Sequence, residues 1–220
     1  IKIKLKANKV GVHRYTVRVS EVENEITTKN NTQTVFVEVI DGRQKVLLAA
    51  AAPHPDLATF KQGIELNKHY EVTLALAEQL DTLTTNRFNL AILYQLPGLN
   101  YSATALINKL QAQKIALWYV IGSQTHLSLF NQVQKQLVFN RSNGTLQEIF
   151  PVYEKNFTTF SLSPETLEQL NHYAPLQVPY TNTVIRGNYT TVFNQRIGRV
   201  DTQSPLFFFM EEDGKKTSFL

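Results

Sequence analysis

Cysteine is absent from this chain of 220 residues, and that absence excludes several kinds of site at once. Without a thiol there can be no disulfide, no thiolate zinc ligand and no cysteine nucleophile. Histidine is scarce too: the 5 histidines are widely spaced, and none forms the His-x-x-x-His pair that places two imidazoles on one helix face. The sequence therefore predicts no metal site, and nothing in it indicates a cofactor.

Charge is also sparse. Charged residues make up 18% of the chain, against 43% hydrophobic residues, which is ample for a folded core. The net charge of +4 and the pI of about 9.2 are mildly basic, but the lysines and arginines are scattered. The nearest approach to a basic run is a lysine series spaced as one face of a strand, at Lys2, Lys4, Lys6 and Lys9. A nucleic-acid site needs a clustered basic patch with aromatic residues, so we expect no nucleic-acid partner.

Long apolar runs are missing as well. The longest extends from Val46 to Ala52, far below the roughly 20 residues that a membrane helix needs. The chain opens on Ile1-Lys2-Ile3 in a strand-like pattern, with no signal peptide. We therefore expect an excised piece of a larger protein, attached to a membrane only through segments outside these residues. A cysteine-free chain suits a cell envelope.

Residues 1–42 are expected to form a small antiparallel β segment. Apolar and polar residues alternate with period two over 2–7, 12–19 and 34–40, and a polar stretch rich in Asn, Thr and Glu separates the last two. Three such strands are close to the minimum that folds alone, and they would leave an unprotected edge or apolar face. The pattern thus predicts a segment that can pair with a second copy, giving a homodimer.

Residues 43–220 change to the alternating pattern of an α/β domain. Strands are expected over 45–52, 70–76, 88–96 and 115–121, with helices over 55–68 and 102–113 between them. This order predicts a mainly parallel, doubly wound, flavodoxin-like sheet. Because strand 45–52 is apolar throughout, it is expected inside the sheet, between strands 70–76 and 88–96.

The last hundred residues predict an irregular β-rich part. We expect helices over 126–134 and 163–173, with Ser163 as the N-cap of the second. Residues 137–140 and 145–152 predict a hairpin around Ser142-Asn143-Gly144. Further strands are expected over 183–185, 189–195, 206–210 and 217–220, the last two joined through Asp213-Gly214. The chain stops inside a strand, so we expect the domain to be truncated at its C-terminus.

Two stretches resemble known families. Glu23-Asn24-Glu25, Asn30-Asn31-Thr32 and Thr34 to Val39 resemble the closing strands of Ig-like adhesion-type modules of bacterial surface proteins. The remainder resembles the class I glutamine amidotransferase-like domain of large bacterial membrane-anchored proteins, which often also carry von Willebrand A-type domains. The matching segments are Val46 to Asp56, Gln95-Leu96-Pro97-Gly98, Ile121 to Thr125, Gln195 to Val200 and Pro205-Leu206.

The resemblance implies the fold but not the catalytic activity. An active amidotransferase of this class needs a cysteine on a sharp strand-to-helix turn and a downstream His-x-Glu pair. Here the turn carries Gly122-Ser123-Gln124-Thr125, and His172 is followed by Tyr173 and Ala174. Ser123 could replace the cysteine only if His126 or His172 served as its base. The simpler interpretation is that Ser123 caps the helix that follows.

Polar residues follow three of the expected parallel strands. They are His54 and Asp56 after the first, Gln95 after the third, and Gly122, Ser123 and Gln124 after the fourth. Ligands of open α/β sheets bind at the carboxyl ends of the strands, so these residues could line one crevice. Alternatively, Pro53-His54-Pro55-Asp56 is a rigid loop in which Asp56 offsets the helix dipole.

Three hypotheses about function follow. The first is a non-catalytic interaction or scaffold module in the extracytoplasmic part of a bacterial cell-envelope protein, with neighbouring domains or other envelope proteins as partners. The second is a hydrolase or amide-processing enzyme that uses Ser123 in place of cysteine. The third is a sensor that binds a small ligand at the strand-end crevice. The first and second differ in whether a base reaches Ser123, and the third requires a pocket.

Overall fold

A computed structural model describes residues 9–21, 23, 25–39, 42–140, 144–170 and 172–220. The chain divides into two compact units, Ile1–Arg43 and Gln44–Leu220. The strand expected over 2–7 and the turn residues Ser142 and Asn143 lie outside the described residues.

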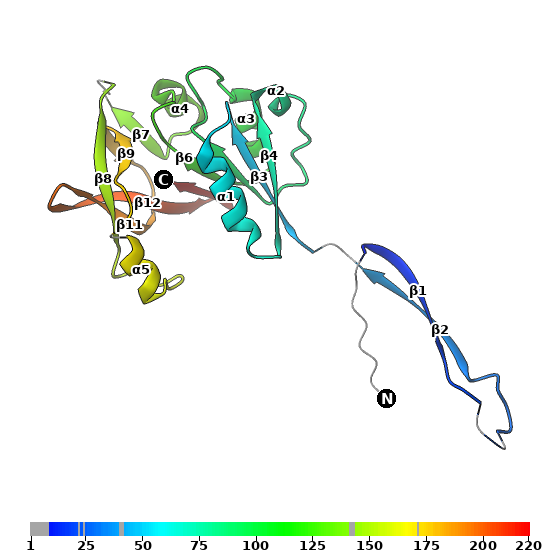
Figure 1. Ribbon diagram of the computed structural model, residues 1–220. Helices are drawn as coiled ribbons and strands as arrows, with labels where there is room; N and C mark the ends of the chain where they lie inside the picture. Colours follow the sequence, from blue (N-terminus) through cyan, green and yellow to red (C-terminus); the bar gives the residue numbers. More distant parts are fainter. Residues whose placement is uncertain (1–8, 22, 24, 40–41, 141–143, 171) are drawn as a thin grey trace. The chain divides into compact units, whose positions relative to one another are not determined.

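The first unit contains an antiparallel β-ribbon of β1 (Gly11–Arg18) and β2 (Thr32–Val39) (Figure 1). In its register Tyr15 pairs with Val35 and His13 with Val37. Paired residues share a face, so one face of the ribbon carries an apolar stripe that Val17 and Val39 extend. Val35 and Val37 remain 47% and 45% exposed, so the described part of this unit leaves the stripe uncovered.

The second unit is a mixed α/β structure around a nine-stranded sheet. Five strands run parallel in the order β4-β3-β5-β6-β13. Their bounds are β3 (Gln44–Ala50), β4 (Tyr70–Leu76), β5 (Leu90–Tyr94), β6 (Ala116–Val120) and β13 (Lys215–Phe219). The expected place of the first apolar strand is confirmed, since β3 pairs with β4 on one side and β5 on the other.

Helices lie on both faces of the parallel strands. On one face α1 (Pro55–Glu65) packs through Leu57, Phe60 and Ile64. The other face carries α2 (Ala77–Leu80), α3 (Thr104–Ala112) and α4 (Leu127–Val133), through a larger buried cluster. Val46 to Ala50 are at most 1% exposed because both faces of β3 are covered, as its uninterrupted apolar sequence predicts.

The C-terminal strands extend the same sheet with antiparallel pairs. The order continues from β13 through β12 (Val200–Glu212), β11 (Thr190–Ile197) and β8 (Leu146–Tyr153) to β9 (Leu176–Pro179). The turn at Asp213-Gly214 joins β12 to β13 as expected. Ser163 accepts a hydrogen bond from the backbone N–H of Thr166, which confirms it as the N-cap of α5 (Pro164–Leu170).

The hairpin expected over 137–152 is wrong. β7 (Leu137–Asn140) pairs instead with β10 (Asn182–Ile185), more than forty residues away, in a separate two-stranded sheet. The physical reason is burial: Leu137 joins the larger core cluster, and Phe139 and Ile185 pack against it. Turn residues are a local signal, and here a non-local apolar face overrides them.

An aromatic cluster lies where β6, β12, β13 and α4 meet. The Tyr119 and Phe219 rings stack at 5.5 Å, Phe208 and Phe219 stack at 5.1 Å, and the Phe130 ring meets that of Tyr119 edge-on. Tyr119, Phe130 and Phe219 are each at most 1% exposed. Such pairs stabilise beyond their buried area by about 1 kcal/mol each.

The Tyr119 hydroxyl is buried, and no described residue makes a hydrogen bond of good geometry with it. Burial raises the pKa of this phenol, and the Gln111 side chain nearby opposes that rise only in part, so the hydroxyl stays neutral. A buried hydroxyl without a partner costs free energy. We therefore expect Tyr119→Phe to raise the free energy of unfolding by about 1 kcal/mol, as measured by urea denaturation. The matched control is Tyr94→Phe: its hydroxyl has partners, so the same change should lower stability by about 1 kcal/mol. Destabilisation by Tyr119→Phe would contradict this account.

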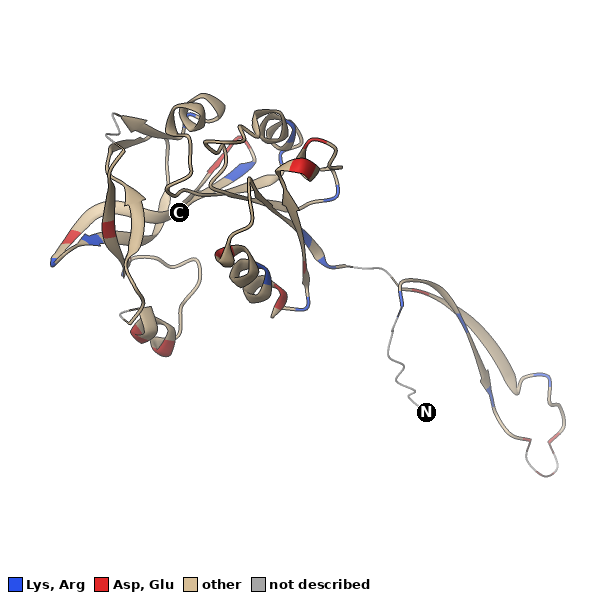
Figure 2. Ribbon diagram, turned by 45° about the horizontal axis from the view of Figure 1, so that its top comes forward, with Lys and Arg blue, Asp and Glu red and all other residues tan. Residues whose placement is uncertain are grey.

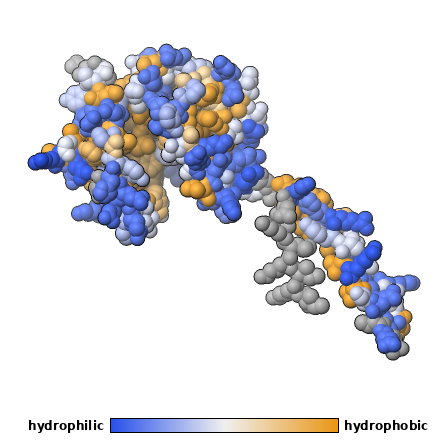
Figure 3. Space-filling view, viewed as in Figure 1, coloured by the Kyte–Doolittle hydropathy of each residue, from blue (hydrophilic) through white to orange (hydrophobic). Residues whose placement is uncertain are grey.

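Hydrophobic side chains reach the surface on the side of the sheet that carries α1 (Figure 3). Figure 3 shows hydrophobic side chains in a hollow of the second unit, beside α1.

Figure 2 shows acidic and basic residues interspersed along the described chain. None of the described helices has the length and hydropathy of a membrane span.

Candidate functional site

A crevice lies at the carboxyl ends of β3 and β5, where the strand order of the parallel sheet reverses. Open α/β sheets bind ligands at such switch points, because neighbouring connections leave to opposite faces there. The crevice has a volume of about 220 Å³. We call it the strand-end crevice; it is lined by Ala50 to His54, Ala77, Tyr94, Gln95, Gly98 to Tyr101 and Gln124.

One wall of the strand-end crevice is a hydrogen-bonded network of His54, Asp56 and Tyr94. The Tyr94 hydroxyl lies 2.7 Å from Asp56 Oδ2, to which it donates, and 2.9 Å from His54 Nδ1. The backbone N–H of Asp56 donates to His54 Nδ1 at 3.2 Å, which makes His54 the N-cap of α1. Pro55 begins that helix, and Asp56 lies in its first turn, where a carboxylate favours the positive end of the dipole.

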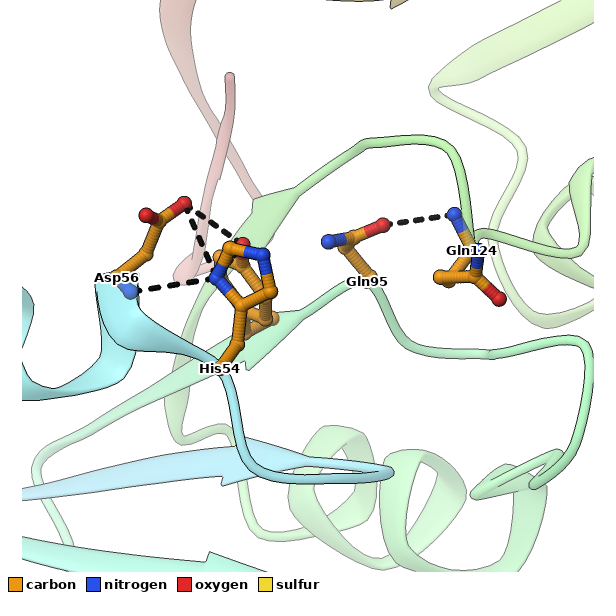
Figure 4. Close-up of polar contacts among 5 residues, drawn as sticks. His54, Asp56, Gln95 and Gln124 are labelled. Carbon is orange, nitrogen blue, oxygen red and sulfur yellow. Dashed lines mark hydrogen bonds and ion pairs between the residues drawn. The ribbon is translucent and has the colours of Figure 1, made fainter.

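Three groups lie against His54 Nδ1: the backbone N–H of Asp56 at 3.2 Å, the Tyr94 hydroxyl at 2.9 Å and Asp56 Oδ2 at 3.5 Å. Because the backbone N–H can only donate, we assign the proton of the neutral ring to Nε2. Figure 4 shows that the far edge of the His54 ring, which carries Nε2, is turned toward Gln95. His54 therefore presents an N–H donor to the crevice.

Burial raises the pKa of Tyr94 to about 12, with the hydrogen bond to Asp56 and the charge of that carboxylate adding to the rise. The Gln95 side chain opposes it in part. Tyr94 therefore remains a neutral phenol near neutral pH. Its hydroxyl lies between two acceptors, Asp56 Oδ2 at 2.7 Å and His54 Nδ1 at 2.9 Å, so Tyr94 connects these two side chains.

Gln95 forms the floor between the two sides of the crevice. Its backbone has φ 53°, a left-handed conformation uncommon for a residue other than glycine, and its N–H donates to Val120 O at 2.7 Å. Gln95 Oε1 accepts the backbone N–H of Gln124 at 2.7 Å. Since that contact identifies the oxygen, the other terminal atom is the amide nitrogen. In Figure 4 it lies on the side of His54.

Gly122 makes room for the Gln95 side chain. A Cβ at this position would lie 2.7 Å from Gln95 Oε1 and 2.8 Å from its Cδ, closer than real Cβ atoms approach their neighbours. The Thr125 hydroxyl accepts the Gly122 N–H, and the Thr125 N–H donates to Gly122 O, which closes the turn. Glycine is thus required here for the close approach of Gln95.

Two N–H donors, from His54 and Gln95, consequently face a crevice whose other walls are mainly alanine, leucine and tyrosine. Ligand sites commonly combine apolar walls with a few placed polar groups. Such a site suits a small molecule with an apolar body and a hydrogen-bond acceptor. Among the described residues no group of three or more histidine or acidic side chains could hold a metal ion.

Ser123 does not belong to this arrangement. It lies exposed in the turn closed by Thr125, with no left-handed backbone, and within the described chain its hydroxyl has no hydrogen-bond partner. The expected role of Ser123 as a helix cap is wrong: His126 caps α4, its Nδ1 accepting the Leu129 N–H. His172 is exposed beyond α5, and neither its ring nor that of His126 hydrogen-bonds to Ser123.

Of the residues singled out in the sequence, the structure brings His54, Gln95 and Gln124 together along the crevice. Asp56 contacts His54 and Tyr94 through hydrogen bonds, and the absence of a side chain at Gly122 leaves room for Gln95. Sequence reasoning missed Tyr94 and Tyr101, whose hydroxyl donates to Asp81. In the sequence, an aromatic residue at the end of an apolar strand looks like a buried core residue. Only the position of Tyr94 next to Gln95 could have indicated its role.

Comparison with known proteins finds structural likeness only. No protein-family model matches the chain, and neither does any curated protein sequence. Similar solved structures include a glutamine amidotransferase from Thermotoga maritima, at 12% identity and a TM-score of 0.41 over 81% of this chain and 74% of that one. A putative ThuA-like protein from Bacteroides uniformis gives 10% identity and a TM-score of 0.43 over 81% and 80%.

An O-acetylhomoserine sulfhydrylase of Wolinella succinogenes has 12% identity and a TM-score of 0.33, over 50% of this chain and 32% of that protein. At such TM-scores none of the three likenesses carries an argument about function. The chain is a mixed α/β protein by its own strand order, and its site is defined by its own side chains.

Proposed function

We propose that this chain is a non-catalytic binding module that holds a small molecule in the strand-end crevice. The strand order β4-β3-β5-β6-β13 supports a flavodoxin-like sheet of the kind found in glutamine amidotransferase-like domains. The observation that carries the proposal is the pair of inward N–H donors, on His54 and Gln95, set at the switch point of that sheet.

The donors define the ligand class. His54 Nε2–H and the Gln95 amide both offer hydrogen, so a carbonyl or amide oxygen between them would satisfy both. The remaining walls are mainly apolar, so they can contact the apolar part of a small ligand. Because each donor is already oriented by a second contact, little ordering is needed when a ligand binds.

The absence of catalysis is part of the proposal. A serine nucleophile needs a base about 3 Å away and donors facing the oxyanion. Ser123→Ala is therefore expected to change the free energy of unfolding by less than about 0.5 kcal/mol, as for surface positions generally. It should also leave ligand affinity unchanged. Labelling of Ser123 by a fluorophosphonate probe, absent in the alanine variant, would contradict this expectation.

Two compounds of one size, only one of which carries a hydrogen-bond acceptor, test the proposal. Benzamide carries a carbonyl acceptor beside its N–H donors, whereas benzylamine is a cation with donors alone at neutral pH. By isothermal titration calorimetry, benzamide should bind and benzylamine should not. Gln95→Ala should weaken benzamide at least about tenfold, since a lost hydrogen bond in a desolvated site costs about that much. Equal binding of the two compounds would defeat the proposal.

A second candidate function is self-association through the β-ribbon, in keeping with an interaction module of a cell-envelope protein. Its supporting observation is the uncovered apolar stripe of Tyr15, Val35 and Val37, because an isolated two-stranded ribbon is marginally stable in water. Sedimentation velocity should show a dimer that the double variant Val35→Thr, Val37→Thr shifts to monomer. Thr16→Val on the other face is the control. A monomer at every concentration would refute this candidate.

A further inference from the structure

A second cavity lies between the two sheets of the α/β unit, and Ile121, just after β6, forms part of its lining. Its volume is about 210 Å³, and its other lining residues come from the strands β7 to β13 and the segments next to them. We call it the intersheet cavity. Leu137, Phe208 and Phe219 close its inner end as part of the larger core cluster.

The register of the strands explains why this space is not filled. Thr183 pairs with Phe139 and Ile185 with Leu137, so these four side chains share one face of the small sheet. On β12, Ser204, Leu206 and Phe208 alternate onto the opposing face. At the inner end large apolar side chains meet, whereas at the outer end Thr183 and Ser204 are too small to fill the gap between sheets.

Water is a poor occupant of the inner end of this cavity. A buried water needs two to four polar partners, and the inner walls offer only leucine, isoleucine and phenylalanine side chains. The polar side chains of the lining are the amides of Gln147 and Gln195 and the hydroxyls of Tyr180, Thr181, Thr183 and Ser204. Two of these groups already have partners, since Thr181 Oγ1 donates to Asn140 O and Gln195 Nε2 donates to Pro205 O. This leaves Gln195 Oε1 available as an acceptor at the rim.

We propose that the intersheet cavity binds a neutral, mainly apolar small molecule whose one polar group is a hydrogen-bond donor, with Gln195 Oε1 as the acceptor. No charged side chain lines it among the described residues, so an ionic ligand would be desolvated without compensation. A cavity of 150 Å³ accommodates benzene, so this larger one suits a molecule of about eight or nine non-hydrogen atoms. The apolar body enters toward Phe208 and Phe219, and the polar end remains at the Thr183 rim.

Indole is a suitable probe, because it is neutral, bicyclic and carries one N–H donor. Isothermal titration calorimetry on the 220-residue chain should give saturable binding with a dissociation constant below about 1 mM, as expected for an efficient ligand of this size. Indole-3-acetate, with the same ring and a carboxylate, should bind at least about tenfold more weakly.

Two phenylalanine variants of one strand provide the decisive comparison. Thr183→Phe places a ring in the intersheet cavity, whereas Val184→Phe adds the same type of ring to the other face of β10, at a position already 42% exposed. Thr183→Phe should weaken indole at least about tenfold while raising or preserving the melting temperature, since it fills a void. Val184→Phe should bind indole as the wild type does.

The outcomes separate this inference from the proposed function. Gln95→Ala, which removes a donor from the strand-end crevice, should leave indole binding intact. The intersheet site is refuted if the wild type shows no saturable indole binding up to the solubility limit. It is equally refuted if Thr183→Phe binds indole as tightly as the wild type, or if Val184→Phe loses as much affinity. If the crevice variant loses benzamide binding but still binds indole, only the strand-end crevice is altered and the intersheet site is supported.

Discussion

Replacing Phe219 with alanine is expected to lower the free energy of unfolding of the α/β unit by about 4 kcal/mol, the cost of truncating a fully buried phenylalanine. The ring is 1% exposed and stacks on Tyr119 and Phe208, which lie on the two strands adjacent to β13. Urea denaturation followed by circular dichroism measures the loss. A change on this scale would show that β13 is an integral part of the sheet.

The matched control is Phe36→Ala in the β-ribbon. Phe36 is 69% exposed, so its truncation should change the unfolding transition of the α/β unit by less than about 0.5 kcal/mol. If Phe219→Ala cost no more than this control, the position of β13 between β6 and β12 would be wrong, and the intersheet cavity would lose its inner wall.

Gly122→Val is expected to abolish measurable benzamide binding, a loss of at least about a hundredfold. The new side chain would occupy the position of the Gln95 amide, so it removes one donor and narrows the strand-end crevice at once. Because the displaced group is a flexible side chain and not backbone, the melting temperature should fall by only a few degrees, about 1 kcal/mol for a domain of this size. Calorimetry and thermal melts measure both quantities.

Gly63→Val serves as the control for this substitution. Gly63 lies exposed in α1, and a Cβ there meets nothing within 4 Å. Valine is better than glycine inside a helix, so stability should not fall. Benzamide affinity should be unchanged. Equal affinity of the Gly122→Val variant and the wild type would mean that the ligand does not contact Gln95.

The sequence predicts the parallel half of the fold well because its signals are local. The apolar run from Val46 identifies a strand buried on both faces, and Pro55-Asp56 marks the start of a helix. The pairing of β7 with β10 could not be predicted, because turn residues near Gly144 favour a local hairpin. Only tertiary burial of Leu137 and Ile185 decides against it.

The site was predictable to the extent that strand ends converge. His54, Gln95 and Gln124 follow three parallel strands, so topology alone places them at one edge of the sheet. Tyr94 could not be identified in the same way, because its sequence context is that of core. Ser123 shows the converse: a plausible nucleophile turn in sequence becomes, in the structure, a turn closed by Thr125 with an uncommitted hydroxyl.

Mapping benzamide on the protein by NMR tests the central claim most directly. In ¹H–¹⁵N spectra of the 220-residue chain, titration should shift the side-chain amide of Gln95 and the backbone amides of His54 and Gln124, with saturation at one common dissociation constant. Thr183 and Ser204 in the intersheet cavity should stay unchanged. Shifts centred on Thr183 and Ser204, with Gln95 unperturbed, would contradict a ligand site at the carboxyl ends of β3 and β5.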